Sequence, residues 1–284
     1  MKNATLLVAL GTTAEPVDLQ QLSESARECN LHLLVLILGA MPPIPVYTFG
    51  IGEYGAYALP DGWQADVDRA NAELEDLRTS ISKYLADQGA SAEVRVASGE
   101  AAYLPNALAH AALTCDAILL GDDLRDNGQL FGDVVRAALF RAPAGVMVNW
   151  MKSTAAIQPK SVFLAWKAGI PSSRAVHAAL PMLRSAEEVT VALIDPVTTR
   201  HRDGDNPGSD VAAWLNHQGC KVTVQQYPSG GEEIGTVMLK RAKETGADMI
   251  VMGAYDHSRL REVVFGGTTR MLIEQRDCPV FLCH

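Results

Sequence analysis

The sequence contains one pattern of residues twice, and this repeat limits the fold more than any other feature. The segment CDAILLGDD at 115–123 aligns with ADMIVMGAY at 247–255, and FGDVVRAAL at 131–139 aligns with FGGTTRMLI at 265–273. The alignment places Asp116, Gly121, Phe131, Gly132 and Arg136 opposite Asp248, Gly253, Phe265, Gly266 and Arg270. In each half, a proline and a short apolar run follow the second segment. Such an internal repeat indicates that one structural unit is built twice.

Short apolar runs alternate with stretches of helical periodicity along both halves. The runs predict buried strands at 5–10, 31–38, 92–97, 116–121, 144–150, 161–166, 188–194, 221–227, 248–253 and 278–283. The expected helices lie between them at 16–29, 64–88, 101–114, 172–185, 208–218, 231–245 and 268–276. Continuous apolar strands that alternate with helices are typical of a parallel sheet covered on both faces. The sequence therefore predicts an α/β protein with five parallel strands in each half.

A polar linker, MKSTAAIQPK at 151–160, separates the two halves. We place the first domain at 1–152 and the second at 153–284. Residues 41–63, which are rich in Pro, Gly and aromatic side chains, have no counterpart in the second half. This insertion follows the second strand, so it begins at the sheet edge where open α/β sheets bind ligands. It is interpreted either as a lid or interface, or as a surface loop packed on its own domain.

The composition argues against several classes of function. A net charge of −9 disfavours nucleic acid and anionic membrane surfaces as partners. The sequence has no apolar run of about 18 residues, which a membrane span requires, and its first apolar run lacks the pattern of a signal peptide. The five cysteines are scattered without a CxxC pair, which indicates reduced thiols and neither a disulfide framework nor a zinc site. We therefore predict a cytoplasmic protein.

The second half resembles the universal stress protein family. The segment ADMIVMGAYDHSRLREVVFGGTTRMLIEQRDCPVFLC resembles the C-terminal signature of that family. The segment SVFLAWKAGIPSSRAVHAALPMLRSAEEVTVALI resembles its opening strand, helix and second strand. The resemblance covers essentially all of 160–284 and, more faintly, 3–150. It implies two tandem, doubly wound, five-stranded parallel-sheet domains of the Rossmann-like, adenine nucleotide alpha hydrolase-like fold, of which the first is degenerate.

The resemblance also implies a set of ligand-binding residues. ATP-binding members carry a glycine, two residues, a second glycine, nine residues, a third glycine and then Ser or Thr. Gly253 and Gly266 match the first and third glycines. Asp256 stands at the second glycine and Gly267 at the hydroxyl position, with Thr268 next. The physical reason for such a loop is that N–H groups at a helix start bind anions, and glycines let the backbone approach a phosphate.

Two residues depart from the ATP pattern in a way that changes the chemistry. A carboxylate at Asp256 beside a triphosphate costs on the order of 1–4 kcal/mol at 4 Å. The first strand of the second half ends near Ala165, and Lys167 stands where adenine-binding members have Asp. Because lysine only donates hydrogen bonds, it cannot accept one from an adenine amino group. Lys167 is interpreted as a phosphate contact, a partner of Asp256 or a solvated side chain.

The first half departs further from the same pattern. Its loop runs eleven residues from Gly121 to Gly132 where the second half has thirteen, and Asp133 and Val134 follow in place of a hydroxyl. Gly11 stands at the position of the adenine-binding Asp. The loop carries additional negative charge at Asp122, Asp123 and Asp126. We therefore predict no nucleotide site in the first half.

Other motifs have structural interpretations. GIGEYG at 50–55 satisfies G-x-G-x-x-G, but no strand precedes it and Pro60 interrupts any following helix, so we reject a dinucleotide site. SGGEE at 229–233 predicts a turn and a helix start with Ser229 as the cap. The histidines are scattered, and neither catalytic residues nor a metal site is predicted.

Three hypotheses of function remain open. The first is a stress-response binding module whose second domain holds ATP or another adenine nucleotide, with Mg²⁺ only alongside the nucleotide. The second is a universal stress protein that acts through protein contacts or another small ligand. The third is a weak ATP hydrolase. For assembly, we expect 144–150 and 278–283 to pair inside the chain, and a homodimer through 41–63 is a further hypothesis; other protein partners are unknown.

Overall fold

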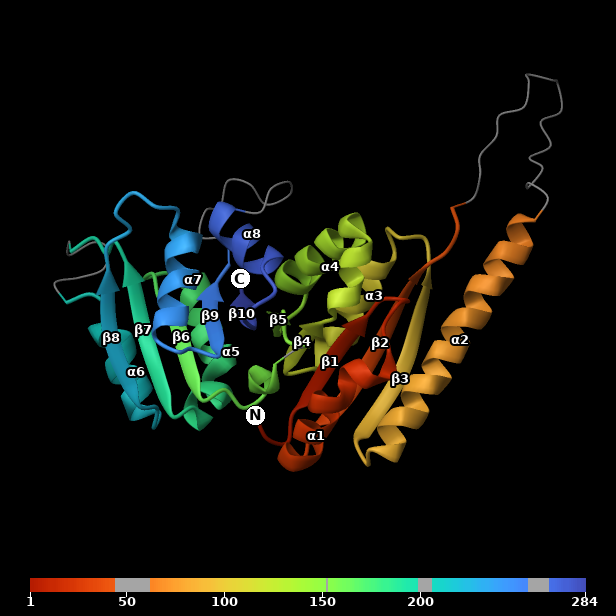
Figure 1. Ribbon diagram of the computed structural model, residues 1–284, viewed down its shortest axis with the longest axis horizontal. Coiled ribbons are helices and arrows are strands. Elements are labelled where there is room, and N and C mark those ends of the chain that lie inside the picture. The colour runs from red at the N-terminus through yellow and green to blue at the C-terminus, as the bar shows by residue number, and fades with distance from the viewer. Residues whose placement is uncertain (44–61, 152, 199–205, 255–265) are drawn as a thin grey trace, which may run out of the picture.

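The computed structural model describes residues 1–43, 62–151, 153–198, 206–254 and 266–284 (Figure 1). Most of the insertion at 41–63, the GIGEYG motif at 50–55 and Asp256 lie outside the described residues. Among the helices of the described ranges, none is long and apolar enough to cross a membrane.

Ten strands form one sheet in the described residues. They are β1 (Thr5–Leu10), β2 (His32–Ala40), β3 (Ser91–Gly99), β4 (Ala117–Leu120), β5 (Gly145–Val148), β6 (Ser161–Ala165), β7 (Glu188–Ile194), β8 (Val222–Tyr227), β9 (Met249–Gly253) and β10 (Val280–Cys283). Their order across the sheet is β3-β2-β1-β4-β5-β10-β9-β6-β7-β8. Each predicted strand is confirmed. The prediction succeeds because each strand is a short run of apolar side chains that need burial on a sheet.

Helices cover both faces of this sheet. They are α1 (Gln20–Cys29), α2 (Trp63–Asp87), α3 (Leu104–Ala111), α4 (Gly128–Arg141), α5 (Ile170–Ser185), α6 (Ser209–His217), α7 (Ile234–Glu244) and α8 (Gly267–Glu274). Short 3-10 turns lie at η1 (Pro16–Leu19), η2 (Ala112–Thr114), η3 (Asp122–Asp126) and η4 (Thr154–Ala156). Side chains alternate along each strand, so β1 sends Leu6 and Val8 to one core and Leu7 and Ala9 to the other. The first core lies under α1, α2, α5 and α6, and the second under α3, α4, α7 and α8.

The two halves repeat the same topology and meet at their last strands. In each half the first strand lies between the second and the fourth, and all pairs within a half are parallel. β5 and β10 pair antiparallel, with Val280 opposite Val148, which confirms the predicted internal contact. The α/β fold class is therefore confirmed, with the two five-stranded units joined into a single sheet.

The repeat extends to individual hydrogen bonds. Asp116 accepts the N–H of Thr5 at 2.7 Å, and its counterpart Asp248 accepts the N–H groups of Lys160 and Ser161 at 2.9 and 3.2 Å. In both halves this aspartate precedes the fourth strand and holds the start of the first strand. The aligned pair therefore has a structural role at the edge opposite the strand ends that bind ligands in such folds.

Two sequence-based expectations need correction. α4 was not among the expected helices, yet it buries Leu130, Val134 and Ala138 at helical spacing. Ser229 was predicted to cap the helix after β8, but α7 begins at Ile234 with Glu233 at the N-cap. The hydroxyl of Ser229 instead accepts the N–H of Gly231 at 3.3 Å, so it stabilises the turn before the helix.

Candidate functional site

The candidate site lies at the point where the strand order of the second half reverses. β6 and β9 are neighbours there, with Ala165 opposite Met252, and the helices that follow them, α5 and α8, pack on opposite faces of the sheet. Open α/β sheets bind ligands in the crevice at this position. Ala165 is buried at the end of β6, whereas Lys167, two residues further on, is exposed. The predicted residues Ala165 and Lys167 therefore lie at the carboxyl edge where a ligand would enter.

Gly253, at the end of β9, is in close contact with the first turn of α5. A Cβ atom at this position would lie 2.4 Å from the Ser172 nitrogen and 2.6 Å from the Pro171 carbonyl carbon. Ser172 is itself buried. Gly253, which the family pattern assigns to the ligand, thus has a packing role: it lets the start of α5 rest on the strand end.

The start of α8 is formed by Gly266, Gly267 and Thr268. Gly266 is the N-cap, and Gly266 and Gly267 are both exposed, so neither residue places a side chain of its own over the first N–H groups of the helix. A Cβ at Gly267 would lie 2.9 Å from the Glu233 carboxylate oxygen Oε1. The carboxylate of Glu233 therefore sits at the end of α8 that attracts negative charge.

The packing of two helices brings Glu233 to that position. Gly235 in the first turn of α7 lies close to α8, since a Cβ there would lie 2.8 Å from the Met271 sulfur and 3.4 Å from Thr268 Cα. α7 and α8 therefore begin side by side at the same edge of the sheet (Figure 1). From the sequence, SGGEE lies near a strand's carboxyl end, where it could contact a ligand, but the contact of Glu233 with the glycines before α8 depends on this packing of the two helices.

The corresponding position in the first half, between β1 and β4, is closed by the chain itself. Asp123 of η3 accepts the N–H of Gly11 through Oδ2 at 2.6 Å. Space for this carboxylate exists because residues 11 and 121 are glycines: a Cβ at Gly11 or Gly121 would lie 2.9 or 2.5 Å from an Asp123 oxygen. Thr13 donates to Asp126 at 2.7 Å and holds the same loop from the other side. A negatively charged side chain thus occupies the place where the second half has Lys167.

The closure places Asp123 in a poorly solvated environment. Burial raises the pKa of Asp123 to about 6, although backbone N–H groups of Gly11 and Leu124 act in the opposite direction. The nearby carboxylate of Asp126 raises the pKa further. The other oxygen of Asp123, Oδ1, is buried without a hydrogen-bond partner among the described atoms. The sequence indicated unfavourable charge in this loop but not that one carboxylate turns inward.

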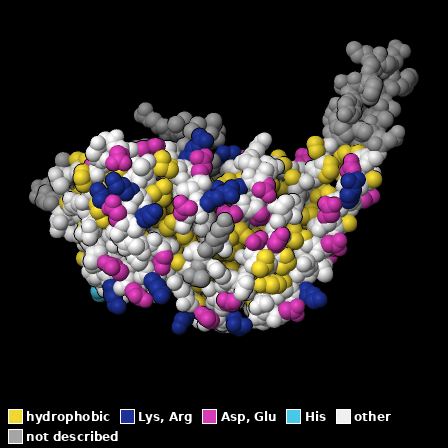
Figure 2. All heavy atoms as spheres, in the orientation of Figure 1, with side chains coloured by type: hydrophobic (Ala, Val, Ile, Leu, Met, Phe, Trp, Pro, Cys, Tyr) yellow, Lys and Arg dark blue, Asp and Glu magenta, His cyan; other side chains and the backbone are white. Residues whose placement is uncertain are grey.

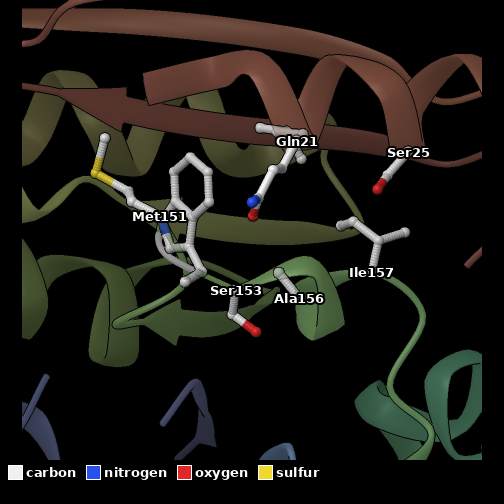
Figure 3. A pocket seen from close by; sticks show the side chains of 8 residues that line it. Gln21, Ser25, Met151, Ser153, Ala156 and Ile157 are labelled. Atoms are coloured by element: carbon white, nitrogen blue, oxygen red, sulfur yellow. The ribbon is translucent and has the colours of Figure 1, made fainter. Parts of the chain in front are cut away.

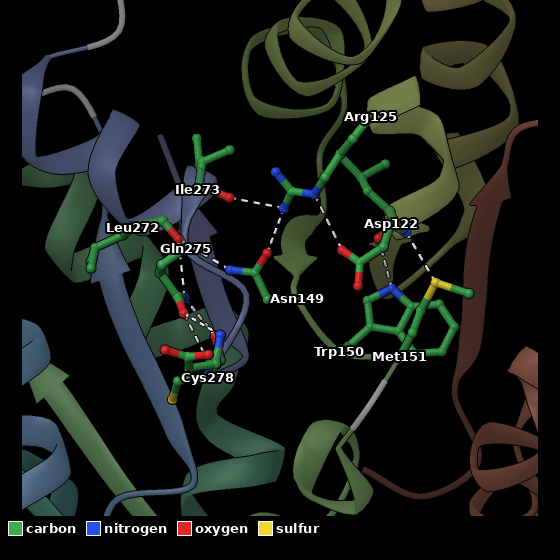
Figure 4. A network of polar contacts seen from close by, with 11 residues as sticks. Asp122, Arg125, Asn149, Trp150, Met151, Leu272, Ile273, Gln275 and Cys278 are labelled. Carbon is green, nitrogen blue, oxygen red and sulfur yellow. Dashed lines mark hydrogen bonds and ion pairs between the residues drawn. The ribbon is translucent and has the colours of Figure 1, made fainter. Parts of the chain in front are cut away.

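A polar network connects this loop to α8 of the second half (Figure 4). The Arg125 guanidinium, whose side chain is 9% exposed, donates to Asp122 at 3.2 Å, to the Ile273 carbonyl at 2.8 Å and to Asn149. Asn149 in turn donates to the Leu272 carbonyl at 3.1 Å. A cation is thereby held at the C-terminal end of α8, where the helix dipole favours positive charge. Arg125 therefore links η3, which closes the first crevice, to the helix that begins at the second.

A small hollow lies where α1 meets the segment that follows β5 (Figure 3). Gln21 and Ser25 of α1 line it on one side, and Met151, Ser153 and Ile157 on the other. Its volume of about 10 Å³ holds no more than a single water molecule. This hollow is a packing gap at the joint between the halves and has no room for a ligand.

One family model matches part of the second half of the chain. The family model of the universal stress protein family matches residues 171–284, which run from the start of α5 through β10. Residues 171–284 form a universal stress protein domain. Comparison with curated proteins returns no match.

Solved structures extend the likeness of fold over the whole chain. A universal stress protein from Archaeoglobus fulgidus DSM 4304 has a TM-score of 0.70 and 16% identity, with 99% of this chain and 96% of that chain covered. A protein from Pseudomonas aeruginosa UCBPP-PA14 has a TM-score of 0.54 and 14% identity, with 99% and 93% covered. The fold upstream of the universal stress protein domain is therefore shared with these structures as well.

The predicted site residues that the structure describes fall into two groups. Ala165, Lys167 and Gly253 lie at the adjoining ends of β6 and β9. Gly266, Gly267 and Thr268 form the start of α8, beside the start of α7. Asp256 lies outside the described residues. Glu233, absent from the predicted set, contacts the second group.

Proposed function

We propose that the chain is a tandem universal stress protein that acts as a binding module, with one ligand crevice in use. The first domain would span 1–152 and the second 153–284. The observation that carries the proposal is the contrast between equivalent positions. In the first half Asp123 fills the space beside Gly11. In the second half Lys167 brings a positive charge to that edge, and α8 begins with two exposed glycines.

The ligand we propose for the second crevice is ATP or another adenine nucleotide, bound mainly by its phosphates. The first N–H groups of α8 would donate to phosphate oxygens, and the hydroxyl of Thr268 would add one more hydrogen bond. Lys167 would supply a countercharge. Because Lys167 cannot accept a hydrogen bond from adenine, recognition would rest on the phosphates more than on the base. Mg²⁺ would bind only together with the nucleotide.

The decisive experiment uses the internal repeat to design its variants. ATP, ADP and AMP are titrated calorimetrically into the full chain, with and without Mg²⁺. Gly267→Asp installs the residue that the first half carries at this position, Asp133, and should abolish binding through charge repulsion and loss of the glycine. Gly128→Asp, which adds the same charge in the first turn of α4, where nothing lies within 4 Å of a Cβ, is the matched control and should leave the affinity unchanged.

A second variant tests the role assigned to the helix start. Glu233→Gln removes the negative charge next to Gly267 while it preserves the size of the side chain. If phosphates bind at this helix start, the variant should bind ATP more tightly, by about fivefold to tenfold. An unchanged affinity in Glu233→Gln would place the phosphates elsewhere.

A second candidate function is binding of a protein partner or of another small ligand. Glu233 favours it, because a carboxylate already occupies the start of α8. If the unaltered chain binds none of the three nucleotides, this candidate replaces the first. Phosphate release in the same ATP samples would instead support the weak hydrolase. The solution mass of the full chain would test the homodimer proposed through 41–63.

A further inference from the structure

A groove of about 760 Å³ lies at the junction between the two halves, beside the end of β9, since Nδ1 of His284 in its lining is 3.1 Å from the Ala254 carbonyl oxygen. Helix α4 contributes Arg136, Phe140 and Arg141 to its lining, with α3 beside it. From the other half come Arg174 of α5 and His284, which follows β10. The volume suits a small molecule, since ligand pockets commonly measure about 300–1,000 Å³. Because both halves supply residues, the groove exists only where the two units are paired.

The groove is basic although the chain is acidic. The lining holds three arginines and one acidic side chain, Asp133, which is ion-paired with Arg136, so the charges of these four side chains sum to +2. Over the whole chain the net charge is −9. Acidic and basic side chains are interspersed on the face shown in Figure 2, in contrast to this grouping. Such a concentration of positive charge attracts anions.

Hydrogen bonds position two of the arginines without using up their donors. Arg141 donates through Nη1 to the Asn106 side chain, and Arg174 donates through Nη1 to the His284 carbonyl at 2.9 Å. Both side chains are exposed at the groove. A guanidinium has five N–H donors in a planar fork that matches the oxygens of a phosphate or carboxylate. Each fork is therefore held in place with donors remaining for a ligand.

An aromatic surface lies between the charges. The rings of Phe140 and His284 meet edge to face, with centroids 4.5 Å apart. Pro105 and Ala137, which also line the groove, are buried. The groove thus combines charged walls with an apolar floor, which is the usual composition of a site for a small organic ligand.

The repeat shows that the fold does not require this groove. Asn149 and His284 are counterparts, since each is the first residue after the fifth strand of its half. At the first junction, beside the end of β5, Asn149 accepts a hydrogen bond from Arg125 and donates one to the carbonyl of Leu272. This polar network closes the contact (Figure 4). At the second junction, beside the end of β10, His284 lines the groove. Among the described residues, side chains of the chain itself close the first junction, whereas His284 lines a basic groove at the second.

We propose that the groove binds a small organic polyphosphate, at a site distinct from the crevice proposed for the nucleotide phosphates. Arg141 and Arg174 would hold the phosphates in bidentate contacts, and the organic part would rest on Phe140. The ligand bridges the two halves, so its binding stabilises their pairing.

Tripolyphosphate is the probe for the charged part of this site. It is titrated calorimetrically at low salt into the full chain carrying Gly267→Asp, which blocks the proposed crevice, and we expect one molecule bound per chain. Arg141→Gln and Arg174→Gln should each weaken binding about tenfold, because each removes one charged fork. Arg69→Gln, which alters an exposed arginine on α2, is the control for general charge and should have no effect. Unfolding temperatures of all variants establish that they fold.

Lys167→Gln separates the groove from the crevice. Binding that persists in Lys167→Gln and weakens in Arg141→Gln and Arg174→Gln supports the groove. Binding that depends on Lys167 alone places the probe in the crevice and overturns the proposal. It is equally overturned if tripolyphosphate does not bind, or if Arg69→Gln weakens it as much as the groove variants do.

Discussion

Burial destabilises the charged form of the Asp123 side chain. Oδ2 accepts the Gly11 N–H, but Oδ1 is buried with no partner among the described atoms. Burial raises the pKa from an ordinary value of 3.8 to about 6, so the folded state holds the proton more tightly than the unfolded chain does. The stabilisation that protonated Asp123 provides is therefore complete below about pH 4 and is lost as the pH rises through about 6.

The first prediction concerns this titration. Asp123→Asn removes the charge and keeps the shape, so at pH 7.5 the variant should be more stable than the unaltered chain by about 2 kcal/mol. The difference should shrink as the pH falls from about 6 toward 4, where the native carboxyl becomes protonated. Urea unfolding at several pH values measures both. Asp76→Asn, on the exposed face of α2, is the control, and a pH-independent difference in Asp123→Asn would contradict the assignment.

At the scale of single residues, spacing in the sequence identifies candidate site residues but does not show which neighbours their atoms contact. The spacing singles out Gly253 as a ligand glycine, whereas in the fold the backbone of Pro171 and Ser172 lies against it. The negative charge of the first loop is visible in the sequence, but the turn of Asp123 toward Gly11 depends on the 3-10 geometry of η3. Glu233 contacts the start of α8 only because two helices pack together. Each of these facts follows from contacts between segments distant in the chain.

Among the elements, strands are predicted better than helix ends. The strands are short apolar runs with a single possible environment, a sheet covered on both faces. α4 is harder to find, because Gly128 and Gly132 lower its helix propensity and the packing of its apolar face supplies the stability. Ser229 is a good cap residue by type, but the helix begins five residues later, after a turn through two glycines. Tertiary contacts decide both cases.

The second prediction concerns the contact between β9 and α5. Gly253→Ala would place a Cβ atom 2.4 Å from backbone nitrogen, which cannot move aside as a flexible side chain would. We expect a loss of about 1–3 kcal/mol in the free energy of unfolding, measured by urea denaturation. The start of α5 should also lose protection in hydrogen exchange.

Gly128→Ala provides the control for this prediction. Nothing lies within 4 Å of a Cβ at Gly128, which is in the first turn of α4. Alanine there should be neutral or stabilising by up to about 1 kcal/mol. If Gly253→Ala behaves in the same way, the close packing of α5 on β9 is wrong.

At the scale of the whole molecule, the pairing of the halves removes two sheet edges. β5 and β10 would each be an exposed edge in a separate five-stranded unit, and exposed edges can pair with other chains. Their antiparallel contact makes one sheet whose outer strands are β3 and β8. The resemblance to the universal stress protein family implies this pairing, because single-domain members pair through their last strands and a tandem chain can make that contact internally. What the repeat does not predict is how side chains fit across the contact.

The last prediction tests that fit. The Phe281 ring of β10 lies over Gly145 of β5, where a Cβ would come within 2.1 Å of the ring, and Phe281 is fully buried. Gly145→Ala should therefore cost about 2–3 kcal/mol in the free energy of unfolding, and Phe281→Leu about 1–2 kcal/mol from lost packing. The double variant has room for both side chains. Its destabilisation should be smaller than the sum of the single effects by at least about 1 kcal/mol, measured in a double-mutant cycle by urea unfolding. Additive effects would mean that Gly145 and Phe281 do not pack together and that the two halves meet in some other way.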